Sequence, residues 1–380
     1  MTTASKAGAE YGFVLLWTLA FSVIATLVLQ ERAARLGLVT GRGLSTALRE
    51  HFHNRHFRLL AIVLVIAAIG FGNAAYESGN ITGASLGLAA ITPYPSQLWS
   101  IVVGGTAFAL LASGRYKVVE RGLIALVVVM SSVFLITMIM VKPDLGAMLS
   151  GLTVPSLPEG SALLVMALIG TTVVPYNLFL HSSAVVEKWP QGFSVDAALR
   201  DSRMDSLLSI GLGGLITLAI VSTSAVAFFG TDTQFSAATV SQQLEPALGP
   251  MAKYFFAVGL LAAGLTSAVT SPLAAAYAVS GVMGWPADLT DRRFRIIWML
   301  VLGAGILAAA LGTRPISAIV FAQAANGFLL PIVAFYLLYV MNSSRLLGAY
   351  RNGWGSNLLG GAVVLVVSAL GIFKLSQLLA

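Results

Sequence analysis

The sequence predicts an all-α, polytopic membrane protein built as a single helical bundle. Of its 380 residues, 57% are hydrophobic and 10% are charged, and the mean hydropathy is +0.88. A soluble domain carries about 25% charged residues, whereas many runs here approach the roughly 20 apolar residues that a transmembrane helix needs. The chain has no cysteine, which excludes a disulfide framework and a thiolate metal site.

Ten apolar runs are expected to cross the membrane completely, and each is bounded by charged, glycine-rich or proline-containing segments. In chain order they are Tyr11–Leu29, Leu59–Glu77, Leu98–Ala112, Gly122–Val141, Leu163–Val186, Leu207–Phe229, Phe255–Val279, Ile296–Leu311, Ile316–Val340 and Leu358–Phe373. Most of them reach about 20 residues, the length that a transmembrane helix needs.

Basic residues predict the orientation, because Lys and Arg concentrate in cytoplasmic loops. The segment after the first run is rich in arginine: Arg32, Arg35, Arg42, Arg49, Arg55 and Arg58. With this segment in the cytoplasm, 17 of the 22 basic residues lie inside and Lys6, Lys142, Lys253, Arg314 and Lys374 lie outside. The net charge of +7 is thereby explained without a nucleic-acid partner. This orientation puts the short N-terminus outside, so we expect one more helix ahead of Tyr11.

The stretch 173–182, VVPYNLFLHS, places costly groups at the centre of an apolar run. Pro175 removes a backbone N–H and clashes with the preceding turn, while Tyr176, Asn177 and His181 are polar. Irregular backbone at membrane depth is tolerated where it is buried in protein or lines a cavity, and transporters place ion sites at such broken helices. A simple proline kink is the alternative, but the cluster of polar residues favours a binding site.

Several segments together resemble the Nramp family of divalent metal ion transporters. Residues 175–182, PYNLFLHS, resemble the sixth-helix motif Met-Pro-His-Asn-Leu-x-Leu-His-Ser of that family. Residues 29–31 (LQE) and 33–41 (AARLGLVTG) resemble the end of its second helix, and residues 260–270 (LLAAGLTSAVT) resemble its eighth. Asp291, Arg292 and Arg293 suit the start of its ninth. The motifs follow the family's order from about Thr3 to the C-terminus.

This resemblance implies a LeuT-like inverted-repeat bundle that moves a divalent cation between outward- and inward-open states, often with protons. It implies one transporter domain over residues 1–380 of a multi-pass protein in a bacterial inner membrane. The expected parts are a first-helix remnant (1–10), the rest of the first repeat (11–150), the second repeat (161–342) and an extra C-terminal helix (358–379). The metal is the substrate in this interpretation, and no cofactor is expected.

The chain departs from the family at the first helix, whose Asp-Pro-Gly-Asn-type break supplies much of the metal site. Residues 1–5 correspond to the outer half of that helix. A start site assigned too late would explain this, and a true truncation that cripples transport is the alternative.

Two further departures concern the sixth-helix motif itself. Val174 stands at the family's methionine position and has no donor atom, whereas a thioether is a soft ligand for transition metals. Tyr176 replaces the first histidine, which removes a group that titrates near neutral pH. Oxygen atoms of Thr171 (side chain or carbonyl), Tyr176 and Asn177 would then dominate the site. Because such ligands suit hard cations, we expect relaxed selectivity toward Mn²⁺ and Mg²⁺.

Three other residues are candidates for a role in transport. Glu77 is the only carboxylate within the ten runs, and the family often has an Asp three residues earlier, where this chain has Ala74. Glu77 and His181 are candidates for a proton or polar pathway, although Glu77 at a helix end facing outer water is the alternative. Gln323 matches a tenth-helix residue that approaches the metal, and an interhelical hydrogen bond is its alternative role.

Other patterns favour competing functions less strongly. Residues 83–87 match G-x-S-x-G, and an intramembrane serine hydrolase using Ser85 and His181 would need a strand–turn–helix elbow there. A truncated, non-transporting membrane scaffold or sensor is the remaining alternative. The histidines His51, His53 and His56 are interpreted as part of a solvated basic loop.

Overall fold

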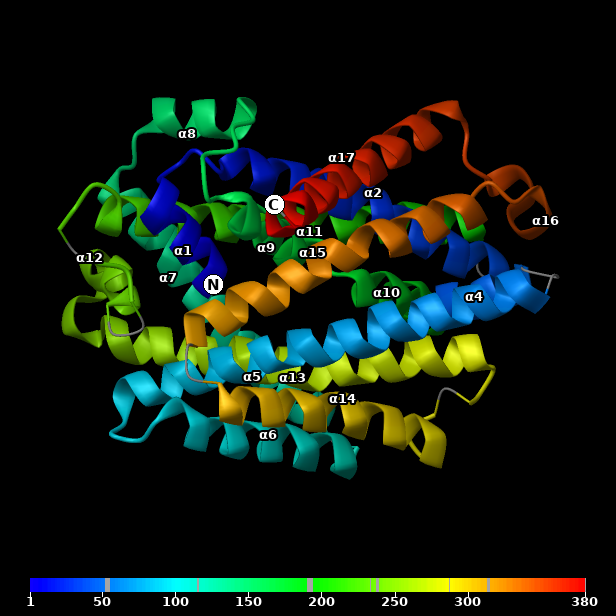
Figure 1. Cartoon of the computed structure of the whole chain (residues 1–380), viewed down its shortest axis with the longest axis horizontal. Coiled ribbons are helices and arrows are strands. Elements are labelled where there is room, and N and C mark those ends of the chain that lie inside the picture. Colours follow the sequence, from blue (N-terminus) through cyan, green and yellow to red (C-terminus); the bar gives the residue numbers. More distant parts are fainter. Residues whose placement is uncertain are drawn as a thin grey trace.

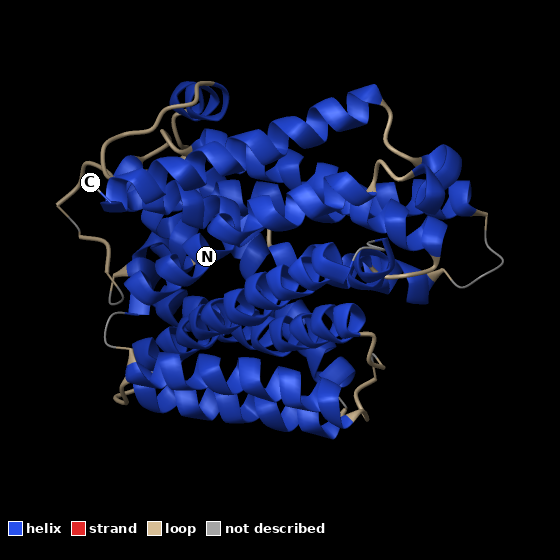
Figure 2. Ribbon diagram, turned by 45° about the vertical axis from the view of Figure 1, so that its right-hand side comes forward, coloured by secondary structure: helices blue, strands red, loops and turns tan. Residues whose placement is uncertain are grey.

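Helices make up almost the entire chain in the computed structural model (Figure 2), which describes all residues except 52–54, 115, 190–193, 233, 237–238, 287, 313–314 and 380. The α-helices are α1 (Thr2–Tyr11), α2 (Leu16–Thr40), α3 (Leu44–His51), α4 (Arg55–Val65), α5 (Gly72–Ile91), α6 (Ser96–Ser113), α7 (Tyr116–Val141), α8 (Leu145–Thr153), α9 (Ala162–Thr172), α10 (Pro175–Lys188), α11 (Val195–Phe228), α12 (Glu245–Leu248), α13 (Ala252–Met283), α14 (Arg292–Leu311), α15 (Pro315–Val340), α16 (Ser344–Leu347) and α17 (Trp354–Leu379). A π-helical segment, η1 (Ile66–Phe71), joins α4 to α5, and short 3₁₀ turns lie at Val240–Leu244, Gly249–Met251 and Gly348–Tyr350.

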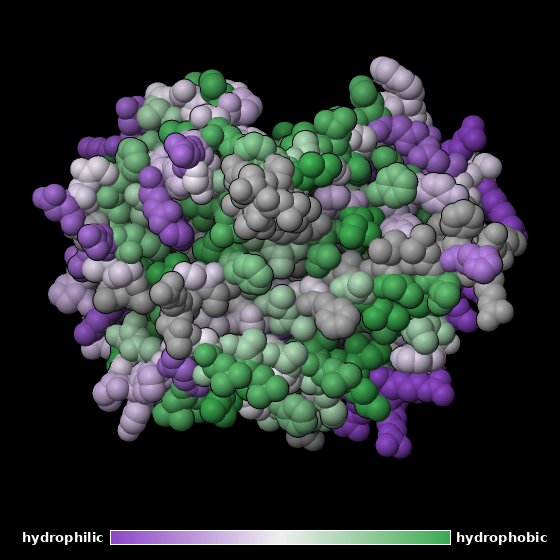
Figure 3. All heavy atoms as spheres, in the orientation of Figure 1, coloured by the Kyte–Doolittle hydropathy of each residue, from purple (hydrophilic) through white to green (hydrophobic). Residues whose placement is uncertain are grey.

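The long helices form two packed groups (Figure 1). In one group, α5 packs against α13, α14 and α6; in the other, α2 packs against α9, α10 and α11, while α1 packs on α11. Helix α15 joins the groups, because it contacts both α5 and α9. Hydrophobic residues cover the middle of the visible surface and hydrophilic ones gather at its two ends (Figure 3), as expected for a protein that crosses a bilayer.

Nine of the ten expected spans coincide with helical stretches in the described part of the chain that are long and apolar enough to cross a membrane. The remaining one, Leu59–Glu77, falls on the succession of α4, η1 and α5, which continues to Ile91. A π-helical turn in the middle of this succession widens the helix, a feature that occurs frequently at functional sites.

The prediction that a loop follows Leu29 is wrong for residues 30–40, which are helical. Helix α2 begins at Leu16 and continues to Thr40, where Gly41 ends it in a left-handed conformation (φ 65°). Arg32 and Arg35 therefore lie on a helix, and they are buried, at 3% and 9% exposure. Their guanidinium groups donate to oxygens at and just before the start of α17: Arg32 to Ser356, and Arg35 to Tyr350 and Asn352. Of the histidine cluster, His53 lies outside the described residues.

The candidate serine nucleophile does not lie on an elbow. Ser85 sits inside the continuous helix α5 and is fully buried. Its hydroxyl donates to the Ile81 carbonyl at 2.6 Å and accepts from Ser100 Oγ at 3.1 Å. A serine held in this way is a helix-packing residue and lacks the exposed geometry that a nucleophile requires.

Candidate metal site at the broken helix

A single apolar stretch is divided into two helices at Val173 and Val174. Helix α9 ends at Thr172, and α10 begins with Pro175 in its first turn. A residue before proline is disfavoured in the helical conformation, and Val174 is accordingly extended, with φ −86° and ψ 120°. Proline fits at the first helical position because its missing N–H needs no partner there. The sequence Val-Val-Pro is thus the local cause of the break.

The break brings the C-terminal end of α9 next to the N-terminal end of α10. The last carbonyls of a helix lack partners within it and carry partial negative charge that favours a cation. Ile169 O accepts from the Val173 N–H at 2.8 Å, and Thr172 O is approached by Thr26 Oγ1 at 3.5 Å. On the other side, the Asn177 N–H donates to Val174 O at 3.1 Å. These three carbonyls at the break thus accept hydrogen bonds in the described structure.

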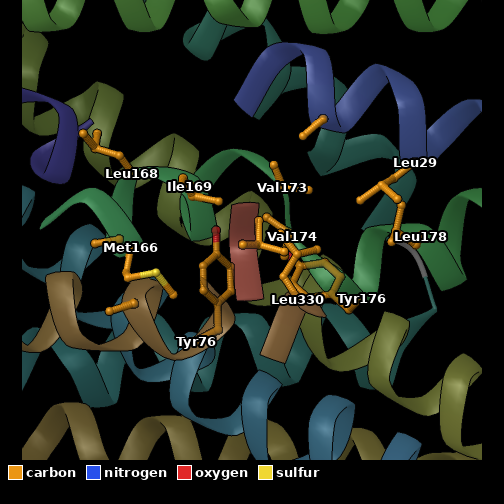
Figure 4. Close-up of a cluster of buried hydrophobic side chains, with 14 of the residues drawn as sticks. Leu29, Tyr76, Met166, Leu168, Ile169, Val173, Val174, Tyr176, Leu178 and Leu330 are labelled. Atoms are coloured by element: carbon orange, nitrogen blue, oxygen red, sulfur yellow. The ribbon is translucent and has the colours of Figure 1, made fainter. Parts of the chain in front are cut away.

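Aromatic side chains from two elements form one wall of this region (Figure 4). The rings of Tyr76 on α5 and Tyr176 on α10 lie edge to face, with centroids 5.7 Å apart and an interplanar angle of 61°. Both tyrosines are buried, at 8% and 4% exposure, and the Tyr76 hydroxyl interacts with Thr171. Thr171 and Tyr176 thus lie together at the break, and Tyr76, which the sequence did not predict as a site residue, lies with them.

The backbone of helix α15 packs directly against the backbone of α9 near the end of α9. A Cβ atom on Gly170 would lie 2.0 Å from the Gln323 carbonyl oxygen, and one on Gly327 would lie 2.6 Å from Met166 O. Only glycine permits this approach, which places Gln323 beside the residue that precedes Thr171. The Gln323 side chain accepts a hydrogen bond from Thr3 Oγ1 of α1, so it already joins two helices next to the break.

The remaining predicted residues occupy different surroundings. Val174 is buried at 6% exposure and packs in the apolar cluster of Figure 4. Asn177 is half-buried in the first turn of α10, and His181 follows one turn later on the same helix face. The Nε2 atom of His181 is buried without a hydrogen-bond partner in the described structure.

Glu77 does not face the break. It is fully buried between α5, α13 and α14, where Ser271 lies beside its carboxyl group and Gly305 packs against its side chain. One oxygen, Oε2, accepts from Asn80 Nδ2 at 3.1 Å, while Oε1 has no hydrogen-bond partner in the described structure. Its neighbour Asn73, one turn earlier, donates to Ser271 O at 3.0 Å. The alternative interpretation, in which Glu77 lies at a helix end and faces outer water, is therefore wrong.

Two contributors escaped sequence reasoning. Tyr76 could have been found from its spacing, because Asn73, Tyr76, Glu77 and Asn80 follow the three- and four-residue steps of one helix face. The pairing of Gly170 with α15 carried no such signal, since glycine is frequent in membrane helices. Among the described residues, no group of three or more His, Asp and Glu side chains is placed so that it could hold a metal.

Comparisons with known proteins identify the fold and the family. The fold resembles a solved mutant of the manganese transporter of Eremococcus coleocola, with a TM-score of 0.77 at 21% identity, covering 99% of this chain and 82% of that one. It also resembles the inward-facing conformation of Mhp1, with a TM-score of 0.57 at 16% identity over 99% and 86% of the two chains. These similarities confirm the expected LeuT-like helical bundle.

Curated relatives agree with the structural similarity. The chain is 28% identical to proteins named "Divalent metal cation transporter MntH" from Deinococcus radiodurans and Bacillus subtilis, covering 99% and 98% of this chain and 86% of each relative. The sequence model of the Nramp family, described as "Natural resistance-associated macrophage protein-like", matches residues 1–377. Because this match extends over nearly the whole chain, the multi-pass membrane protein described here belongs to the Nramp family.

Proposed function

We propose that this protein carries divalent metal cations across a bacterial inner membrane by alternating access, with the ion bound at the break between α9 and α10. The observation that carries the proposal is the interrupted helix itself, which places two helix ends beside neutral polar side chains inside an otherwise apolar bundle. The names of the relatives support the substrate class, since they are divalent metal cation transporters and a manganese transporter.

Oxygen atoms make up the proposed ligand set. Thr171 and Asn177 stand on the two sides of the break, Tyr176 shapes the pocket between them, and Gln323 approaches from α15. Val174 contributes no donor atom. A site of this composition suits Mn²⁺ and Mg²⁺ better than softer ions, because hard cations prefer oxygen ligands.

Glu77 and His181 are proposed to serve a proton or polar route beside the metal. Each has one buried polar atom without a partner in the described structure, and ionisable groups at membrane depth mark ion and proton pathways. Because Glu77 packs against α13 and α14, this route would pass between these helices and α5, beside the break.

Metal flux into proteoliposomes tests the proposal. The unmodified protein should take up Mn²⁺, and Asn177→Ala should lower the apparent Mn²⁺ affinity. Losing even a hydrogen-bonded partner of a ligand costs about 10–100-fold in metal affinity, so we expect a loss of at least this size. Ser132→Ala is the control, because Ser132 is exposed on α7 and bonds only within its own helix. Absence of metal-dependent flux from the unmodified protein would favour the scaffold or sensor alternative.

The selectivity argument has its own variant. Val174→Met adds a thioether at the break, so Cd²⁺ and Mn²⁺ should gain on Mg²⁺ in competitive uptake. Leu178→Met is the matched control, since it places the same side chain at a buried position one turn away. Unchanged flux ratios in Val174→Met would show that the oxygen-only ligand set is incorrect.

A further inference from the structure

Helix α3 lies at the predicted cytoplasmic ends of α10 and α13. It contacts α10, α13 and α15, and its inner face, with Leu44, Ala47 and Leu48, is at most 1% exposed. A helix of eight residues is too short to be stable alone. Its position must therefore be set by the helices against which it packs.

A single serine hydroxyl joins α3 to the inner half of the broken helix. Ser182 on α10 is fully buried. Its Oγ accepts a hydrogen bond from the Leu44 N–H at 2.8 Å and donates one to Phe179 O at 2.8 Å. The first N–H of a helix has no partner within it, so Ser182 satisfies a buried donor that otherwise would be left unpaired.

Close contacts fix α3 from both sides. Toward α10, a Cβ atom on Gly43 would lie 2.4 Å from Ser183 Oγ. Toward α13, a Cβ atom on Gly281 would lie 2.0 Å from Ser45 Oγ. Helix α3 thus packs closely against both α10 and α13. A shift of α10 or α13 must either move α3 with it or break one of these contacts.

Helix α3 makes different kinds of contact with α13 and with α10. On the α13 side, the guanidinium of Arg49 lies against Gly284, which ends α13 in a left-handed conformation (φ 71°). A cation at the C-terminal end of a helix is favoured by the helix dipole. On the α10 side, the directional contact is the Ser182 hydrogen bond. That bond is therefore the point at which α3 and α10 would separate.

We propose that Ser182 is a positioning residue that couples α10 to α3. Helix α10 is the inner half of the broken helix, and through this bond α10 and α3 would move together. The inference rests on the proposed transport function, because it assigns the coupling to the step in which α10 moves. Asn177 lies on the same helix five residues before Ser182, and a continuous helix transmits the position of one end to the other. Coupling through Ser182 would therefore control when the inner side of the metal site opens.

Two adjacent serines provide a matched test. Ser182→Ala removes the bond to Leu44, while Ser183→Ala removes a hydroxyl that lies against Gly43 but, in the described structure, forms its hydrogen bond to Phe179 O of its own helix. Leaving a buried N–H unpaired costs about 1–3 kcal/mol, which corresponds to about 5–150-fold in an equilibrium. We expect the kcat for Mn²⁺ uptake to fall at least about fivefold in Ser182→Ala, with KM close to that of the unmodified protein. Ser183→Ala should match the unmodified protein in both constants.

A distance measurement separates coupling from transport itself. The chain has no native cysteine, so spin labels can be placed at Ala184→Cys on α10 and Glu50→Cys on α3, which are both exposed. With the Ser182 bond intact, the label–label distribution should be narrow, with and without Mn²⁺. In Ser182→Ala it should broaden, and in Ser183→Ala it should stay narrow.

Gly43→Ala gives a second route to the same state, because its added Cβ atom must push α3 away from Ser183. It should broaden the distribution as Ser182→Ala does. Identical narrow distributions in all variants would overturn the coupling, even if Mn²⁺ uptake is observed. Failure of the unmodified protein to take up Mn²⁺ would instead overturn the transport proposal, while the distance result would still decide the coupling.

Discussion

Two polar sites adjoin α5, and they differ in the groups that they bury. At the break, the ends of α9 and α10 lie beside two tyrosines and the Asn177 amide. One residue along α5 from Tyr76, Glu77 brings a carboxyl group into a fully buried position with one hydrogen-bonded oxygen and one oxygen that has no partner in the described structure. A neutral site can be emptied and filled at modest cost, whereas an unpaired buried charge is expensive. The first arrangement suits a transported ion, and the second suits a residue that gains or loses a proton.

Closing the space around Glu77 should have the largest effect on stability. In Gly305→Ala the new Cβ atom would lie 2.5 Å from Glu77 Cγ and 3.1 Å from its backbone carbon, so α14 must move away from α5. Overpacking of this kind costs typically about 1–3 kcal/mol, and the melting temperature in detergent should fall. Gly303→Ala on the same helix meets no atom within 4 Å, and it should be neutral or stabilising by up to about 1 kcal/mol. Equal melting temperatures would show that the two helices are not closely packed at Glu77.

Disrupting the wall of the break should have an intermediate effect. Tyr176→Leu keeps an apolar side chain but removes the edge-to-face contact with Tyr76, which is worth about 0.5–1.5 kcal/mol. The variant should melt at a slightly lower temperature and lose affinity for Mn²⁺, as measured by uptake at increasing ion concentration. Leu178→Tyr, which adds a ring elsewhere in the cluster, should not restore the affinity when combined with it.

Removing the charge at Glu77 should change stability least and coupling most. Glu77→Gln keeps the shape of the side chain and an oxygen that can accept from Asn80, so the free energy of unfolding should change by only about 1 kcal/mol. Mn²⁺ uptake at equal pH on the two sides should remain close to that of the unmodified protein, whereas stimulation by an acidic outer solution should disappear. Stimulation that persists in the variant would place the proton route elsewhere.

The fold class could be predicted from the sequence because its strongest patterns reflect what the membrane requires of a protein. Long apolar runs, the arginine-rich segment and the proline within an apolar stretch each follow from the cost of burying polar groups. Those signals located the interruption of α9 and α10, although the ion-binding roles of Thr171, Tyr176, Asn177 and Gln323 stay predictions. The relatives confirm a membrane transporter family without testing these residues.

The parts that sequence reasoning missed depend on contacts between distant segments. The sequence predicts Arg32 and Arg35 in a cytoplasmic loop, since nothing in their neighbourhood shows that oxygens more than 300 positions later accept hydrogen bonds from them. The direction of Glu77 was equally hidden, because a difference of one residue on a helix decides whether a side chain faces α9 or α14. Such facts arise from packing, which local patterns do not encode.

The backbone contact between α9 and α15 has a mechanical consequence. Since Gly170 lies against Gln323 O and Gly327 lies against Met166 O, steric overlap obstructs the sliding of either helix along the other. Of the ligands proposed above, Thr171 and Gln323 belong to these two closely packed helices, whereas Asn177 belongs to α10, beyond the break. For such a site, a movement at the break would change the contact with Asn177 and leave the contact between α9 and α15 in place.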